Sequence, residues 1–156
     1  MLDVEFAPLC RRIAADLAEI TPDEDVLVVT EPENVTVARA VAAGARSVGA
    51  DATLSVMPRL DAHGNEPPEN VAAAMAAADV CVTATTHAIT HTRARLAAAE
   101  ADTRIVVMRG VTEDLMLAGG MNTDYDRLAA VTAAYRNALA AAEEARLTCP
   151  NGSDLW

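Results

Sequence analysis

Residues 25–30 read DVLVVT, a short run that is apolar from Val26 to Val29 and rich in β-branched side chains. A strand that is covered by helices on both faces has this composition, because neither face meets water. The run therefore predicts a parallel strand inside a sheet. Before it, apolar residues recur at helical spacing from Phe6 to Ile20, and Thr21-Pro22 ends the pattern, which predicts a helix packed on the sheet.

The alternation of strand and helix continues along the chain. After the first strand we expect a helix capped by Asn34 and ended by Gly49, strands over 52–57, 80–84 and 104–108, and helices over 68–78 and 90–101. Such alternation specifies right-handed βαβ units. The sequence thus predicts one α/β domain with an open, mostly parallel, doubly wound sheet. We expect a flavodoxin-like or Rossmann-like fold with strand order 2-1-3-4.

The pattern changes after Met108. Thr112 is placed to cap a short helix, and a long Ala-rich helix is expected over 125–146. The last residues, TCPNGSDLW, are polar and turn-rich, and we expect no further element there. We therefore assign residues 1–150 to the α/β domain and residues 151–156 to a boundary segment.

Composition excludes several classes of protein. The net charge of −11 repels nucleic acid and anionic membranes, and no apolar window is long enough to span a bilayer. The absence of Lys removes both a Schiff-base amine and the phosphate-binding Lys of a P-loop. The three cysteines are widely spaced and the start of the chain shows no signal peptide, so we expect a cytoplasmic protein with reduced thiols.

In open parallel sheets, ligands bind outside the carboxyl ends of the strands, so the loops there hold the candidate residues. The first of these loops has no GxGxxG, which disfavours a dinucleotide, and no GxSxG occurs in the chain. The loop after Ala84 reads TTHAITHTRAR and is the densest in reactive groups. Because we expect its helix to start near Thr90, His87 and His91 should not form a metal pair. The alternative for His91 is a surface histidine without a role.

The charged residues around this loop also have two interpretations. Arg93 and Arg95 lie near the expected helix start, where free backbone N–H groups would help them to bind a carboxylate or a ring oxygen. They are otherwise ordinary solvated arginines. Glu66 precedes Pro67-Pro68 and is either a ligand-facing carboxylate or a charge near a helix start.

The stretch EPPENVAAAMAAADVCVTATTHAITHTRARLAAAEADTRIVVMRGVTEDLM begins at Glu66 and resembles the N-terminal domain of a metalloenzyme family. That family contains ring-cleaving dihydroxypyridine dioxygenases and thermophilic metallo-aminopeptidases. The resemblance extends from about Asp25 to Asp154. Its most specific part is THTRAR, from Thr90 to Arg95, supported by the EPP, MRGVTE and NGSDL motifs.

In the dioxygenase branch, the resemblance implies an Fe(II) centre held by two His and one Asp in the C-terminal domain. It also implies that a histidine of the HT motif faces the substrate, and this histidine maps onto His91. A neutral imidazole there would deprotonate a ring hydroxyl. Around it, the expected substrate-binding residues are Thr90, Thr92, Arg93, Arg95 and Glu66.

The chain stops where the metal-bearing domain is expected, so we expect no metal or other cofactor in it and Fe(II) in a partner domain. The leading interpretation is half of a dioxygenase-like metalloenzyme that acts on a small cyclic or aromatic substrate. The alternatives are a non-catalytic binding or assembly subunit and the N-terminal part of an aminopeptidase-like hydrolase. A partner chain or a homo-oligomer would cover an exposed apolar surface, and the Ala-rich face of 125–146 and Trp156 are its candidates.

Overall fold

The computed structural model describes residues 2–121 and 123–156, with side chains from Phe6 onward. The chain forms two compact units, Met1–Asn122 and Thr123–Trp156. The first unit contains the sheet and the candidate site, and the two units are described separately below.

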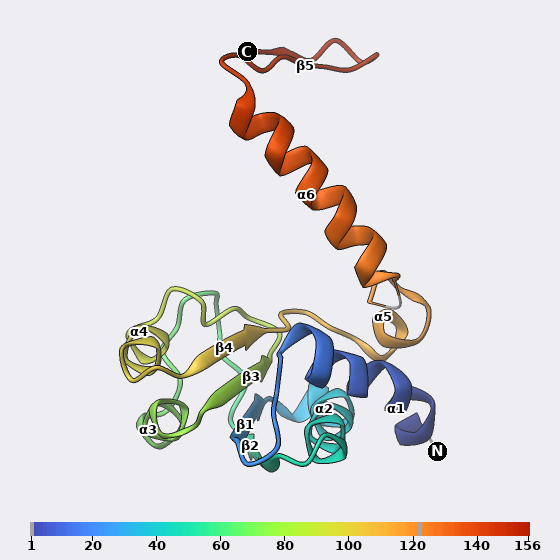
Figure 1. Cartoon of the computed structure of the whole chain (residues 1–156). Coiled ribbons are helices and arrows are strands. Elements are labelled where there is room, and N and C mark those ends of the chain that lie inside the picture. Colours follow the sequence, from blue (N-terminus) through green and yellow to red (C-terminus); the bar gives the residue numbers. More distant parts are fainter. Residues whose placement is uncertain (1, 122) are drawn as a thin grey trace. The chain divides into compact units, whose positions relative to one another are not determined.

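Four parallel strands form the sheet of the first unit, in the order β2-β1-β3-β4 (Figure 1). Their bounds are β1 Asp25–Thr30, β2 Asp51–Val56, β3 Val80–Ala84 and β4 Arg104–Val107. The predicted class and strand order are confirmed. β1 is central and pairs with a strand on each side, and all of it beyond Asp25 is buried.

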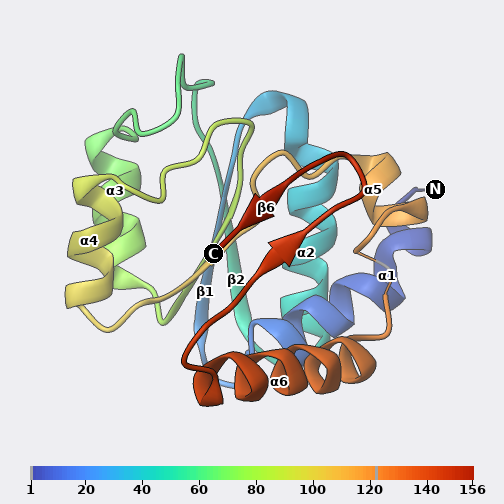
Figure 2. The ribbon, with the colours of Figure 1, turned by 90° about the horizontal axis from the view of Figure 1, so that it is seen from above.

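Helices cover both faces of this sheet (Figure 2). One face carries α1 Leu2–Arg12 with its π-helical extension Ile13–Leu17, α2 Val35–Ser47 and the short α5 Glu113–Ala118. The other face carries α3 Glu69–Ala77 and α4 Arg93–Glu100. Side chains of β1 alternate between the two cores: Val26 and Val28 belong to the first, and Leu27 and Val29 to the second. The sheet is doubly wound, as predicted.

Two helix starts differ from the sequence-based expectation. Asn34 lies at the N-cap of α2 but makes no capping bond, because its Nδ2 donates to Thr86 Oγ1 at 3.4 Å instead. A 3-10 turn, Pro32–Asn34, leads into that helix. α4 starts at Arg93 and not near Thr90, because the Thr92 hydroxyl caps it by accepting from the Arg95 N–H at 3.2 Å. The predicted cap of α5 is confirmed, since Thr112 Oγ1 accepts from the Leu115 N–H.

The second unit contains α6, Tyr125–Ala141, which is five residues shorter than the predicted helix and buries none of its residues within its own unit. The expectation of no further element after it is wrong. Residues Leu147–Thr148 and Asp154–Leu155 pair as a small antiparallel hairpin, β5 and β6. Arg146, just before β5, is linked to Asp154 of β6, because its Nε and Nη2 donate to the two carboxylate oxygens of Asp154 at 2.7 Å each.

None of the helices in the described part of the chain has both the length and the hydrophobicity needed to cross a membrane.

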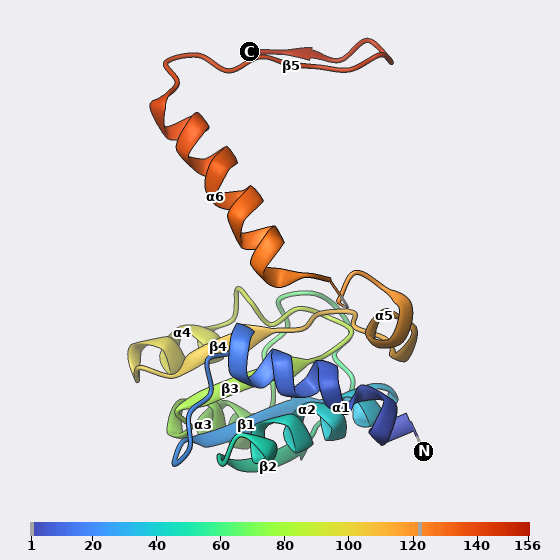
Figure 3. The ribbon, with the colours of Figure 1, turned by 45° about the vertical axis from the view of Figure 1, so that its right-hand side comes forward.

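Helix α1 packs closely on α2 at Gly44 (Figure 3). A Cβ built on Gly44 would lie 2.4 Å from the backbone oxygen of Cys10. We expect Gly44→Ala to lower the free energy of unfolding by about 1–3 kcal/mol, because backbone cannot yield cheaply and this cost exceeds the gain of about 1 kcal/mol in helix propensity. Urea denaturation measures the change. Gly120→Ala is the control, since an added Cβ there meets no atom within 4 Å. An equal effect of both substitutions would contradict the close packing.

Candidate functional site

Because the strands are parallel, the segments that follow their carboxyl ends lie at one edge of the sheet. These segments are residues 31–34 after β1, 57–68 after β2, 85–92 after β3 and 108–112 after β4. They include all three histidines of the chain. We call the segments 57–68 and 85–92 the β2 loop and the β3 loop.

Glu31 is the first residue after β1, and its side chain is 0% exposed. The backbone at Glu31 is still extended, so the alternation of β1 continues and the carboxylate lies on the α3/α4 side with Leu27 and Val29. One carboxylate oxygen accepts from the Leu60 N–H at 3.2 Å, and the other accepts from the Thr86 N–H at 2.9 Å. A single buried carboxylate thus joins the end of β1 to both the β2 loop and the β3 loop.

The hydrogen bonds to Glu31 decide its charge. Burial alone is the largest influence and raises the pKa of this carboxyl. The N–H and hydroxyl of Thr86, the N–H of Leu60 and the charge of Arg59 act together in the opposite direction and leave the pKa below its ordinary value. Glu31 is therefore an ionised group inside the fold, stabilised mainly by hydrogen-bond donors.

Two further hydrogen bonds join the β2 loop to the β3 loop at Ala88. The Ala88 carbonyl accepts from the Gly64 N–H at 2.9 Å, and the Ala88 N–H donates to His63 Nδ1 at 3.0 Å. The second bond fixes the tautomer of His63, because a nitrogen that accepts carries no proton. In this arrangement the proton of a neutral His63 is on Nε2.

The rings of His63 and His87 meet edge to face, with centroids 4.8 Å apart and planes inclined by 80°. Within the described part of the chain, His87 Nδ1 is buried and has no hydrogen-bond partner. His91 is exposed in the turn just before Thr92. Because α4 begins only at Arg93, His87 and His91 both lie before it and do not share a helix face. The contact that does form, between His63 and His87, was not predicted.

Glu66 caps the start of α4 with both of its carboxylate oxygens. They accept from the N–H groups of Arg93 and Ala94 at 2.8 and 3.2 Å. The Arg93 backbone bond is the largest influence on this carboxyl and, with the other contacts, holds its pKa below the ordinary 4.5. The expectation of free N–H groups at this helix start is wrong, because Glu66 and Thr92 occupy them.

The remaining candidate residues differ in how far they can reach a ligand. Thr92 is buried, and its hydroxyl also donates to the Ile89 carbonyl at 2.7 Å. Thr90 and Arg95 are half-buried. The Arg93 side chain is 91% exposed and lies 3.5 Å from Glu66 Oε1. His91 and Arg93 are thus the two of these residues whose side chains are exposed, and Arg93 also pairs with Glu66.

The residues that the structure describes do not fit an iron site. Among the described residues, no group of three or more His, Cys, Asp and Glu side chains is arranged to hold a metal ion. His63 also uses its lone-pair nitrogen to accept from Ala88. Cys10 and Cys81 are buried, and burial raises the pKa of their thiols to about 11 and about 12, so neither is poised as a thiolate ligand.

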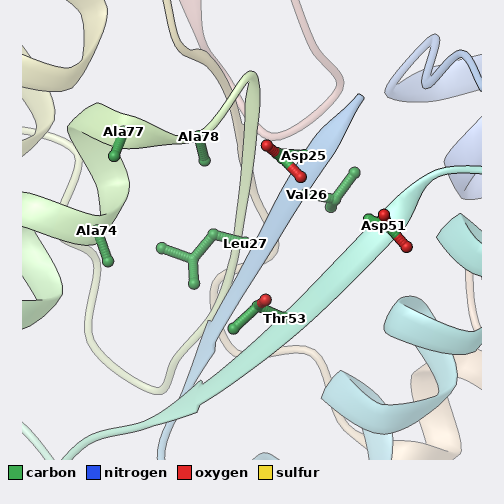
Figure 4. A pocket seen from close by; sticks show the side chains of 8 residues that line it. All are labelled: Asp25, Val26, Leu27, Asp51, Thr53, Ala74, Ala77 and Ala78. Atoms are coloured by element: carbon green, nitrogen blue, oxygen red, sulfur yellow. The ribbon is translucent and has the colours of Figure 1, made fainter. Parts of the chain in front are cut away.

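One hollow of about 300 Å³ is lined in part by Glu66 and Arg93. Two others lie at opposite ends of the sheet. One, of about 320 Å³, lies at the amino ends of β1 and β2, beside α3 (Figure 4). Its polar lining comes from Asp25, Asp51 and Thr53, and Ala side chains of α3 complete it. The other, of about 310 Å³, lies between the starts of α2 and α5 at the carboxyl edge and is lined in part by Glu33, Glu113 and Asp114. The hollow at the amino ends is remote from every predicted site residue.

No protein-family model matches the sequence, and no curated protein matches it either. Among solved structures, the fold is similar to 2,5-dihydroxypyridine dioxygenase from Pseudomonas putida KT2440, with a TM-score of 0.72 and 17% sequence identity. The match covers 97% of this chain and 46% of that chain. At this identity the likeness establishes the fold alone. The chain spans less than half the length of the dioxygenase that it resembles.

The cap at Glu66 gives a pH-dependent prediction. Because the folded pKa of Glu66 is lowered, its contribution to stability is full above the ordinary pKa of 4.5 and is lost as the pH falls through the folded value. We expect Glu66→Gln to melt at a lower temperature than the parent at pH 7, with the difference shrinking below about pH 4.5. Thermal melts across this range measure it. A difference independent of pH would contradict the charged cap.

A second prediction concerns metal content. Since the candidate ligands are scattered or engaged, we expect the purified chain to hold no iron or zinc in stoichiometric amount. Elemental analysis after dialysis against Fe(II) or Zn²⁺ measures this. Stoichiometric metal that is lost in His87→Ala would instead assign a metal site to the histidines at this edge.

Proposed function

We propose that this chain is the substrate-facing half of a dioxygenase-like metalloenzyme, and that its substrate is a small cyclic or aromatic compound with an acidic ring hydroxyl. The observation that carries the proposal is the match to 2,5-dihydroxypyridine dioxygenase, which extends over 97% of this chain and only 46% of that one. On this proposal, Fe(II) is held by a partner domain or chain and supplies the oxygen chemistry. A cytoplasmic location is part of the proposal and is consistent with the free thiols of the chain.

His91 is the residue to which we assign chemistry. It is exposed at the carboxyl edge, immediately before a helix start that Thr92 and Glu66 cap. A neutral imidazole at this place takes the proton from a ring hydroxyl and leaves an electron-rich anion. Arg93 lies two residues away and is exposed enough to bind that anion beside Glu66, with which it already pairs. Arg95 lies in the first turn of the same helix.

Glu66, Thr90 and Thr92 have a different role in this proposal. The oxygens of Glu66 and Thr92 are already engaged by backbone N–H groups of α4. We therefore assign Glu66 and Thr92 an indirect role: they hold in place the turn and the helix start that carry His91 and Arg93. Thr90 is half-buried in that turn and is the remaining hydroxyl available for direct contact.

Two other functions remain as alternatives. A non-catalytic binding or assembly subunit would, like the proposed half-enzyme, need no metal-ligand set among the described residues. The N-terminal part of an aminopeptidase-like hydrolase would share the same division between two domains. The structural match is to a dioxygenase, which supports the oxidative function over the hydrolytic one.

The proposal predicts that His91→Ala lowers turnover by about 10²–10⁴-fold, the usual contribution of a general base. The assay contains this chain, the domain or partner chain that carries the metal, Fe(II) and 2,5-dihydroxypyridine. The melting temperature should stay within the range of a surface substitution, because His91 is exposed. His87→Ala is the control and should reduce turnover much less.

Two results would count against this assignment. Equal turnover of His91→Ala and the parent would remove His91 from the chemistry. A large loss of thermal stability in His91→Ala would show that the side chain serves the fold. Absence of any metal-bearing partner in the native host would favour the non-catalytic alternative.

A further inference from the structure

We propose that Glu31 is a positioning residue, which sets the distance between the β2 loop and the β3 loop and thereby holds the substrate-facing edge in its working arrangement. This inference rests on the function proposed above. It adds a residue that lies sixty positions before His91 in the sequence and that acts through the two loops.

The first argument is the geometry of the contacts. Glu31 is rigidly placed, because it directly follows the central strand and Thr30 Oγ1 donates to the Ala84 carbonyl of β3 at 2.9 Å. From there the carboxylate receives Leu60 on one oxygen and Thr86 on the other. Both loops are therefore hydrogen-bonded to the same carboxylate, and a substitution of Glu31 changes the acceptor for both.

The second argument is that the arrangement requires a carboxylate. The donors aimed at Glu31 are the N–H of Leu60, the N–H of Thr86 and the Thr86 hydroxyl. A carboxylate has two accepting oxygens, whereas Gln would turn an NH₂ group towards one of these donors. The donors are ordered in turn, because Asn34 Nδ2 donates to the same Thr86 hydroxyl oxygen.

The third argument is the energetic cost of burying the charge of Glu31. A fully buried anion is expensive to desolvate, and among the described residues Glu31 has no salt-bridge partner within 4.0 Å. The charge of Arg59 helps to lower the pKa of Glu31, but Arg59 Nη1 pairs with Oε1 of the exposed Glu33, 4.0 Å away. Buried polar networks of this kind are justified where a precise arrangement is needed, and support around a functional group is such a case.

The fourth argument links the carboxylate to the candidate residues. His87 follows Thr86 directly, and the Thr85 hydroxyl donates to the His87 carbonyl at 2.7 Å. On the other loop, His63 lies three residues after Leu60 and accepts from Ala88. Ile89 is fully buried and carries the connection on to Thr92, which caps the helix beside His91. Glu31 thus sets the positions of the loop segments that carry His63 and His87 relative to the turn that carries His91.

The test uses Glu31→Gln, with Glu33→Gln as the matched control on the same segment. Amide hydrogen exchange of the full chain, followed by NMR, reports the loops without any ligand. We expect the Leu60 and Thr86 amides to exchange at least about 10-fold faster in Glu31→Gln, because each loses a charge-assisted hydrogen bond. The Val28 amide of β1 and all amides in Glu33→Gln should be unchanged.

The second readout is turnover in the assembled enzyme with 2,5-dihydroxypyridine. A positioning role predicts a loss of about 10–100-fold in kcat with a small change in KM, as for residues that orient a reacting group. A purely structural role would lower the melting temperature and leave kcat per folded molecule unchanged. If Glu31→Gln does not fold, Thr86→Val removes the hydroxyl alone, and Thr86→Ser is its control.

The outcomes separate this inference from the proposed function. Unchanged exchange at Leu60 and Thr86 overturns the inference whatever His91 does. Faster exchange with unchanged kcat, while His91→Ala lowers turnover, overturns the positioning role and leaves the proposed function standing. Unchanged turnover in both Glu31→Gln and His91→Ala overturns both. Faster exchange together with a loss in kcat, neither seen in Glu33→Gln, supports the inference.

Discussion

The double pairing of β1 is the constraint on which the rest of this unit depends. β1 has a parallel neighbour on each side and a helix layer on each face, so its side chains from Val26 to Val29 have to be apolar. Polar groups can begin only where the strand ends. The first ones, Thr30 and Glu31, are still fully buried and need partners within the protein. They find these partners in the strand beside them and in the two adjoining loops.

The candidate site follows from this arrangement. The β2 loop and the β3 loop are joined at Glu31 and at Ala88. Glu66 of the β2 loop also bonds to the start of α4, which directly follows the β3 loop. The result is an edge whose backbone donors are largely satisfied internally, leaving the His91 and Arg93 side chains turned to solvent. The chemistry that we assign to this edge therefore depends on these few exposed side chains, which are carried by a hydrogen-bonded backbone. The hollow at the amino ends of β1 and β2 is lined by none of the predicted site residues.

The sequence predicts the strands well and the loop contacts poorly. β1 and β3 match the expected bounds because each is a continuous buried run, whereas the start of α4 differs because Thr92, and not a residue near Thr90, supplies the cap. The pairing of His63 with His87 joins residues from two loops, and no local pattern reveals it. Glu31 was also missed, although a signal exists: it continues the alternation of Leu27 and Val29 and therefore points into a covered face.

The central claim is that the carboxyl edge around His91 faces the substrate. The most direct measurement is a titration of the ¹⁵N-labelled chain with 2,5-dihydroxypyridine, followed by amide chemical shifts. The account predicts shifts gathered in residues 57–68 and 85–95. Shifts confined to Asp25, Asp51 and Thr53, around the hollow at the other end of the sheet, would contradict it.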